Sequence, residues 1–191
     1  MTPSQGPLSI LAISGSLRTR SSNTILLEAA ARLAAPGLEI GLFNGIGAMP
    51  HFNPDLDGPD PPPAVAAFRA RLAVADGLLI SSPEYAHGVP GVLKNALDWL
   101  VSGIEAVAMP VMLLNASPRA THAQASLIET LRTMAMEVVD GRPFDVPIAG
   151  RPLDLGGVLA DPELVAAIQT ALGALLAACA RSREAGRRLV P

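Results

Sequence analysis

The sequence predicts an α/β protein whose parallel sheet is covered by helices on both faces. Short apolar runs at residues 8–13, 77–82 and 111–114 have the composition of strands that are buried on both sides. The segments between these runs carry apolar residues three or four positions apart, which is the spacing of amphipathic helices. Strands and helices that alternate in this way are typical of parallel sheets with right-handed crossovers.

Strands and helices alternate along the whole chain in this interpretation. Strands are expected at 8–13, 38–43, 77–82 and 111–114, with a weak fifth strand at 137–139. The helices are marked by apolar residues at helical spacing: Leu26, Ala30 and Leu33; Val65, Phe68 and Leu72; Val92, Leu93, Ala96, Leu97 and Leu100; Leu127, Leu131 and Met134; and Leu164, Ile168, Leu172, Leu175 and Cys179.

Particular residues mark the ends of these elements. Ser22 or Asn23 is suited to cap the first helix, since both side chains accept backbone N–H bonds. Pro90 is suited to the first position of the third helix. The segment 161–163 is typical of a helix start, and it leads into the last helix. The turn-rich passage 44–63 is longer than most connections in compact domains, so we expect a functional loop there.

Composition excludes several classes of protein. Half of the 191 residues are apolar, which excludes a disordered chain, and the net charge of −3 provides no basic field for nucleic acid or a membrane surface. The single cysteine argues for a reducing compartment. The run 171–180 is shorter than the roughly 20 residues that cross a bilayer. No basic residue precedes Arg18, as one would in a secretory signal. We expect one cytoplasmic domain, 1–191, with flexible ends at 1–7 and 182–191.

The loop after the first strand has the composition of a phosphate site. Gly15 allows a tight turn, and Arg18 supplies a guanidinium. The helix that follows adds unpaired N–H groups and the positive end of its dipole. Small polar donors complete the loop: Ser16, Ser21, Ser22 and Asn23. A simple helix cap with an exposed arginine is the alternative, and the loop matches neither the Walker pattern nor G-x-G-x-x-G.

The loops after the third and fourth strands are expected to form two further walls of the same ligand site. The segment 83–88 forms a stiff bend whose amides can face a flat ligand, with Tyr85 beside it. Glu84 is either a catalytic acid or a solvated carboxylate, and His87 either approaches the ligand or fills the turn. In the next loop, Ser117 is placed to form the third wall, and Arg119 either meets a phosphate of a dinucleotide or is solvated.

Three blocks of this sequence resemble one family. GSLRTRSSN (15–23), PHFNPDLD (50–57) and SSPEYAHGVPGVLKNALDW (81–99) are similar, in this order, to the NAD(P)H-dependent FMN reductases, the flavodoxin-like group of quinone, azo-dye and chromate reductases. The resemblance extends over about residues 8–140. It implies a flavodoxin-like three-layer sandwich with a five-stranded parallel sheet in the order 2-1-3-4-5.

The resemblance also implies an activity and a site. FMN would take hydride from NADPH or NADH and pass electrons to a small-molecule acceptor such as a quinone, azo compound, free flavin or metal oxyanion. Homodimers or homotetramers are common in the family. The first loop would hold the FMN phosphate, the second would border the isoalloxazine, and Ser117 would lie by its pyrimidine side. The expected cofactor-binding residues are Ser16, Arg18, Ser21, Ser22, Asn23, Pro83, Glu84, Tyr85, Ala86, His87, Gly88, Ser117 and Arg119.

Two departures from the family leave alternatives open. Ala86 stands where the family usually has Asn, and residues 117–124 replace a glycine-rich loop. Two functions are alternatives to the reductase. One is a flavodoxin-type electron carrier without NAD(P)H chemistry, and the other is a flavin-free phosphate-binding scaffold. The histidines lack metal-ligand spacing, and Cys179 is expected in the core. Lys94 and Trp99 are expected to be structural.

Overall fold

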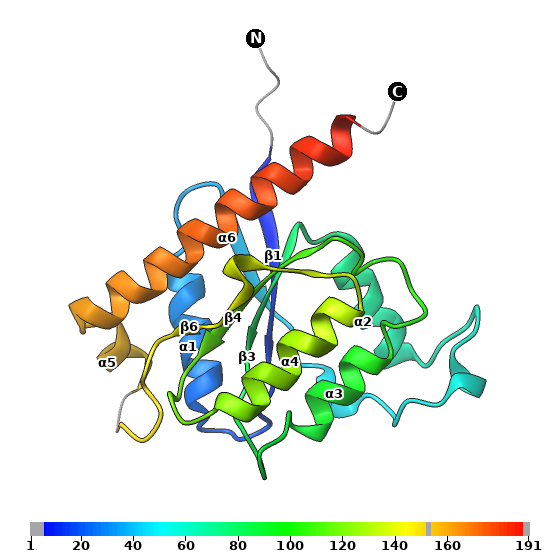
Figure 1. Cartoon of the computed structure of the whole chain (residues 1–191), viewed down its shortest axis with the longest axis horizontal. Coiled ribbons are helices and arrows are strands. Elements are labelled where there is room, and N and C mark those ends of the chain that lie inside the picture. The colour runs from blue at the N-terminus through cyan, green and yellow to red at the C-terminus, as the bar shows by residue number, and fades with distance from the viewer. Residues whose placement is uncertain (1–5, 152–153, 189–191) are drawn as a thin grey trace.

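A parallel sheet lies between two layers of helices (Figure 1). The computed structural model describes residues 6–151 and 154–188. The strand order is β2-β1-β3-β4-β5, with β6 also paired to β4, and every pairing is parallel. This confirms the predicted order. The strands are β1 (Leu8–Ser14), β2 (Leu38–Leu42), β3 (Gly77–Ser81), β4 (Pro110–Asn115), β5 (Glu137–Val138) and β6 (Phe144–Asp145).

The edge of the sheet beside β4 differs from the prediction of five strands, because it is split into two short strands. β5 pairs with the first two residues of β4, and β6 pairs with the last two. Between them the chain turns away from the sheet through Asp140 and Gly141, whose φ angles are 54° and 64°. A strand of two residues has no periodicity, so β6 left no signal in the sequence.

The helices divide between the two faces of the sheet, and the strands alternate their side chains to match. Ile10 and Ala12 of β1 join the apolar cluster that α1, α5 and α6 cover. Leu11 and Ile13 join the cluster that α2, α3 and α4 cover. The helices are α1 (Ser22–Arg32), α2 (Pro63–Ala73), α3 (Gly91–Asp98), α4 (Thr121–Thr133), α5 (Leu155–Leu159) and α6 (Pro162–Arg188).

Two helix starts lie one residue away from the predicted positions. Ser21, not Ser22 or Asn23, caps α1, since its side chain accepts the N–H of Thr24 at 3.4 Å. Pro90 has φ −53° and ψ 135°, so it precedes α3 as the cap rather than occupying the first helical position. Because its ψ is extended rather than helical, Gly91 takes the first helical place.

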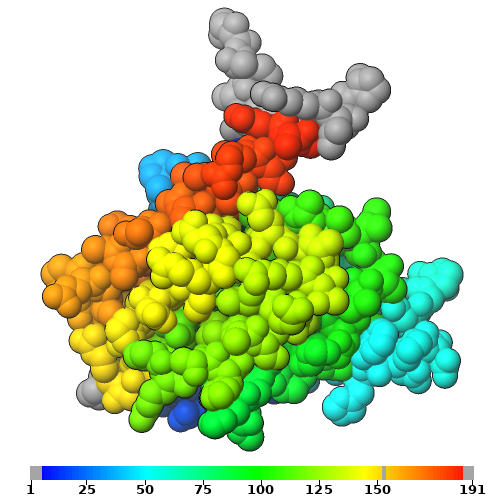
Figure 2. Space-filling model, viewed as in Figure 1, coloured from blue at the N-terminus to red at the C-terminus, as the bar shows by residue number. Residues whose placement is uncertain are grey.

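The passage 44–63 contains two short 3₁₀ turns, Ile46–Ala48 and Pro54–Leu56, and α3 holds it to the body of the protein. The side chain of Asn95 accepts the N–H of Phe52 at 2.8 Å and donates to the carbonyl of Pro50 at 2.9 Å. The indole N–H of buried Trp99 donates to the same carbonyl at 2.9 Å. Trp99 is therefore structural, as expected. Part of this passage (cyan) projects from the body of the molecule in Figure 2.

The last helix is longer than the sequence indicated. Residues 182–188, expected to be part of a flexible polar tail, form the end of α6, while residues 1–5 and 189–191 lie outside the described residues. Arg183 explains the extension, because its guanidinium donates to both carboxylate oxygens of Asp76 and to the carbonyls of Gly6 and Pro7. These contacts hold the helix end against the start of the sheet.

α6 also carries apolar residues into the core. From Pro162 to Gly186 it is long and apolar enough to cross a membrane by length and composition alone, but its apolar side, including Ile168 and Leu175, packs in the core cluster. Cys179 is buried as predicted, and an ideal Cβ added to Gly77 would lie 2.5 Å from its sulfur. Burial raises the pKa of the Cys179 thiol to about 12. The thiol is therefore a packing group rather than a nucleophile.

Candidate functional site

A cavity of about 360 Å³ lies at the carboxyl ends of β1, β3 and β4, where the strand order reverses. Ten of the thirteen predicted site residues line it, and they come from all three predicted loops. Ala86, His87 and Gly88 do not line it. Residues that the sequence reasoning missed complete the wall: Ser82, Ala116, Ala120, Ala149 and Gly150. The predicted residues in the wall are Ser16, Arg18, Ser21, Ser22, Asn23, Pro83, Glu84, Tyr85, Ser117 and Arg119.

The first loop packs directly against the loop after β3. The N–H of Gly15 donates to the carbonyl of Ser81 at 2.8 Å. An ideal Cβ added to Gly15 would lie 2.6 Å from Oγ of Ser82, so a larger residue would displace the Ser82 side chain. The hydroxyl of Ser81 donates to Oδ1 of buried Asn23 at 2.9 Å. Asn23 therefore fixes the first turn of α1 to β3, and the two walls form one unit.

Two serines of this loop have hydroxyl hydrogens that no described residue accepts. Oγ of Ser16 accepts the N–H of Arg18 at 3.3 Å, and Oγ of Ser21 accepts the N–H of Thr24 at 3.4 Å. Because each oxygen already accepts a backbone bond, the hydroxyl hydrogen remains to be donated. Neither Ser16 nor Ser21 donates it to another described residue. Both side chains line the cavity, so both can donate to a ligand that carries acceptor oxygens.

The cavity is electropositive at this end. α1 carries no acidic residue in its first turn. Ser21 accepts the N–H groups of Thr24 and Ile25, which leaves those of Ser22 and Asn23 and the positive end of the dipole for a ligand. Arg18 and Arg119 line the cavity from opposite loops, and their side chains form no hydrogen bond or ion pair with the described residues. This donor set, of hydroxyls, backbone N–H groups and guanidinium, fits a phosphate monoester.

The segment Tyr85–Gly88 is a two-residue hairpin turn. Tyr85 and Gly88 exchange backbone hydrogen bonds of 3.1 and 2.9 Å. Ala86 and His87, between them, have φ angles of 49° and 60°. Both residues are left-handed, as in a type I′ turn, which favours Asn or Gly at these places. The departure at Ala86 is therefore a source of backbone strain, and the turn presents Tyr85 to the cavity.

Glu84 has a role that neither alternative from the sequence included, that of a helix cap. Its Oε2 accepts the N–H of Ala123 at 2.8 Å, in the first turn of α4. Ala120, at the cap position of that helix, has no side chain that could accept this bond. Glu84 therefore caps α4 from the neighbouring loop, where its negative charge also faces the positive end of the helix dipole.

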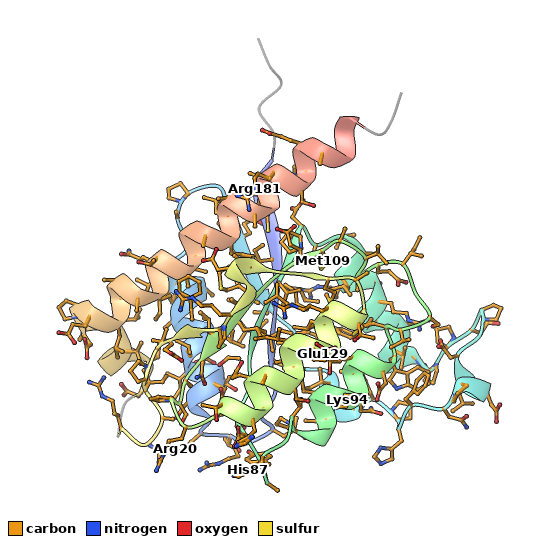
Figure 3. All side chains as sticks on the ribbon, viewed as in Figure 1. Arg20, His87, Lys94, Met109, Glu129 and Arg181 are labelled. Atoms are coloured by element: carbon orange, nitrogen blue, oxygen red, sulfur yellow. The ribbon has the colours of Figure 1, made fainter. Side chains whose placement is uncertain are left out.

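His87 links the same two elements from outside the cavity. Its ring stacks on that of His122 in α4, with centroids 4.3 Å apart and planes 7° from parallel. Both histidines are exposed, and Figure 3 places His87 at the outer end of the loop. The stack fills the space beside the turn, which agrees with the second of the two roles considered for His87. Parallel stacked rings are not arranged to share a metal ion, and the described residues contain no cluster of three or more metal-binding side chains.

The third wall combines β4 with the segment that follows β6. The side chain of Asn115 donates to Oδ1 of Asp145 at 2.7 Å and accepts the N–H of Ser117 at 3.2 Å. The N–H of Ala149 donates to the carbonyl of Ala116 at 2.9 Å, which brings Ala149 and Gly150 to the cavity. Ser82 and Ala116 follow directly after β3 and β4, so their position in the sequence could have predicted a place in the site. Ala149 and Gly150 belong to no motif and carried none.

The fold and the cavity define a flavodoxin-like protein with a cavity at the switch point of its sheet. A sequence model described as NADPH-dependent FMN reductase matches residues 8–149. The chain belongs to this family of FMN- and NAD(P)H-dependent oxidoreductases.

Individual relatives agree with the family. An NAD(P)H-dependent FMN reductase of Pseudomonas aeruginosa is 35% identical over 173 residues, which cover 88% of this chain and 93% of the relative. An NADPH:quinone oxidoreductase of Arabidopsis thaliana is 46% identical over 94 residues, about 47% of each chain. FerB, a flavoenzyme NAD(P)H:(acceptor) oxidoreductase of Paracoccus denitrificans, superposes with a TM-score of 0.73 at 26% identity, over 91% of this chain and 98% of FerB.

Proposed function

We propose that the cavity binds FMN with its phosphate at the first loop and its isoalloxazine beside Tyr85, and that the protein reduces quinones with NAD(P)H. The observation that carries this proposal is the donor set at the start of α1. The hydroxyl hydrogens of Ser16 and Ser21 are free to be donated, the first turn of α1 has unpaired N–H groups, and Arg18 lines the same cavity. Together they meet the several acceptor oxygens of one phosphate.

The remaining predicted residues have separate roles in this proposal. Asn23 and Glu84 are positioning residues, because one fixes α1 to β3 and the other fixes the second loop to α4. Ser22, Pro83, Ser117 and Arg119 line the cavity. Ala86, His87 and Gly88 support the turn that presents Tyr85. This division assigns contact with FMN to the lining residues and only an indirect effect to the turn.

When bound, FMN supplies the chemistry of accepting a hydride and releasing electrons to an acceptor. The chain orients it: the first loop neutralises the phosphate, and the Pro83–Gly88 segment borders the ring. No acid–base group is required of the protein, which agrees with Glu84 being engaged as a helix cap. Quinone is the acceptor that we propose, since relatives over half of the chain are named for it.

The experiment is an absorption spectrum of the purified protein with FMN, followed by anaerobic addition of NADPH, or of NADH to a parallel sample, and then of a quinone. We expect bound flavin, loss of its visible absorption with NADPH, and recovery with the quinone. A protein that stays colourless after incubation with FMN would contradict the proposal and favour a flavin-free scaffold. Flavin that binds but is not reduced by either nucleotide would favour the electron carrier, and reduction without recovery would exclude quinone as the acceptor.

We also propose that the protein is a homodimer or homotetramer, as is common in the family. The segment 101–107 exposes three large apolar side chains, Val101, Ile104 and Val107, and Ile104 is 85% exposed. Apolar groups gathered in this way favour an interface. Light scattering after size exclusion should give a mass of two or four chains, and Ile104→Glu should lower it. A monomeric wild-type protein would contradict the proposal.

A further inference from the structure

A second hollow adjoins the cavity at the first loop, and its wall includes two arginines, Arg20 and Arg151, that do not line the FMN cavity. Its volume is about 590 Å³. It shares part of its wall with the cavity, and the rest comes from the first loop, from Ile25 of α1, and from Arg151 and Asp154. The shared residues are Arg18, Ser22 and Gly150, and the others that matter here are Arg20, Arg151 and Asp154.

The hollow is positive in a chain whose net charge is −3. Three guanidinium groups line it against one carboxylate, that of Asp154. This carboxylate accepts the N–H of Gly157 at 2.8 Å as the cap of α5, so it is engaged by its own helix. The side chain of Arg20 is exposed and forms no hydrogen bond or ion pair with any residue in 6–151 or 154–188.

Arg151 is held in place at the rim by a contact that leaves most of its donors unused. One of its terminal nitrogens donates to Oδ2 of Asp161 at 2.9 Å. Asp161 in turn accepts the N–H groups of Glu163 and Leu164 at the start of α6, at 3.0 and 3.3 Å. A guanidinium has five N–H donors, so this ion pair orients Arg151 without saturating it.

We propose that this hollow binds the 2′-phosphate of NADPH, and that Arg20 and Arg151 make the protein prefer NADPH to NADH. The inference rests on the proposed function, because it assumes that a nicotinamide nucleotide binds next to the FMN cavity. The 2′-phosphate is the group that the two nucleotides do not share. As a phosphomonoester it carries close to two negative charges on one phosphorus, which two guanidiniums in the wall of one hollow can match.

Kinetics with Arg20→Ala and Arg151→Ala test the assignment in the FMN-loaded protein. Each substitution should lower kcat/KM for NADPH by about tenfold, the scale of one charge-assisted hydrogen bond, and leave that for NADH within about twofold. Arg181→Ala is the matched control, since Arg181 is exposed on α6 at the opposite end of the molecule from Arg20 (Figure 3). It should change neither value.

Two further measurements distinguish recognition of the 2′-phosphate from a structural effect of the ion pair and from an effect on catalysis. Asp161→Asn removes the ion pair but keeps Arg151, so the preference for NADPH should survive it. Calorimetry should show that adenosine 2′,5′-bisphosphate binds more tightly than adenosine 5′-monophosphate, and that the difference shrinks about tenfold in Arg20→Ala. This titration is made with and without FMN, so it tests the hollow even if the protein oxidises neither nucleotide.

Three results would overturn the inference. Equal losses for NADH and NADPH would assign the arginines to the shared pyrophosphate. Unchanged kinetics in both variants would leave the hollow without a role in nucleotide binding. Equal affinity of the wild-type protein for the two adenosine phosphates would show that the hollow does not recognise a 2′-phosphate. Absence of FMN binding, with the bisphosphate still preferred, would instead overturn the proposed function and keep the anion site.

Discussion

The carboxylate of Glu84 accepts the N–H of Ala123 at 2.8 Å and so joins the loop after β3 to the first turn of α4. Both elements contribute walls to the cavity or support them: the loop presents Tyr85, and α4 begins directly after Ala120. The bond therefore couples the shape of the cavity to the start of a helix that lacks a side-chain cap of its own.

Glu84→Ala should lower the free energy of unfolding by about 1 kcal/mol, because it removes a helix cap. It should also weaken FMN binding several-fold, since the Tyr85 loop loses its attachment to α4. Urea denaturation and a flavin titration measure the two effects. Glu129→Ala, on the exposed side of the same helix, is the control and should change neither (Figure 3). Weaker FMN binding without loss of stability would mean that Glu84 contacts the flavin itself.

The left-handed backbone at Ala86 predicts that glycine will stabilise the protein at this position. The φ of 49° is strained for alanine and accessible to glycine, so Ala86→Gly should raise the free energy of unfolding by about 0.5–1 kcal/mol. Ala166→Gly, at an exposed position within α6, should have the opposite effect and lower it by about 1 kcal/mol. Thermal unfolding of both variants measures these changes in stability. A destabilised Ala86→Gly protein would contradict the turn geometry.

Arg18→Ala should weaken FMN binding and leave the fold intact. Arg18 is exposed and its side chain forms no contact that the described residues show, so no packing is lost. Losing a charge-assisted hydrogen bond to phosphate should raise the dissociation constant for FMN about tenfold or more. Riboflavin, which lacks the phosphate, should bind the variant and the wild-type protein equally. If both flavins lose affinity equally, Arg18 does not contact the phosphate.

The anchoring of the 44–63 passage predicts a pH-dependent contribution to stability. Asp57 accepts the hydroxyl of Ser102 at 2.5 Å and pairs with Arg69 at 2.8 Å. These contacts, the Ser102 hydrogen bond first, lower the pKa of the Asp57 carboxyl below its ordinary value. A lowered pKa stabilises the fold above the pKa of the unfolded chain, about 4, and the effect is lost as the pH falls through the folded value.

Asp57→Asn should therefore lower the free energy of unfolding by about 1 kcal/mol at pH 7, and the difference should shrink as the pH falls below about 4. Denaturation at pH 7 and at successively lower pH values measures this. Asp60→Asn, at an exposed carboxylate in the same passage, is the control and should show no such difference. A deficit that persists unchanged at the lowest pH would mean that the charge of Asp57 is not its source.

The sequence predicted those features that depend on local pattern. The long apolar strands β1, β3 and β4 and the loops after them follow from composition, so most of the cavity was placed correctly. The two residues that it missed after β6 depend on a partner far away in the chain. Ala149 and Gly150 reach the cavity only through a backbone bond to Ala116.

Two other roles could not be inferred from the chain alone. Glu84 caps a helix that begins 37 residues later in the sequence than the residue itself, and no local motif marks that pairing. The polar end of α6 is helical because the side chain of Arg183 donates to the carboxylate of Asp76 and to the carbonyl of Gly6, just before β1. Composition does not reveal these contacts. The sequence pattern specified most of the elements, whereas tertiary hydrogen bonds determined how the loops meet.

A crystal structure of the protein with FMN tests the central claim most directly. We expect the phosphate to accept hydrogen bonds from Ser16, Ser21 and the first turn of α1, with Arg18 beside it, and the isoalloxazine to lie along the Pro83–Gly88 segment. A flavin bound with its phosphate away from this loop, or its ring away from that segment, would contradict the account.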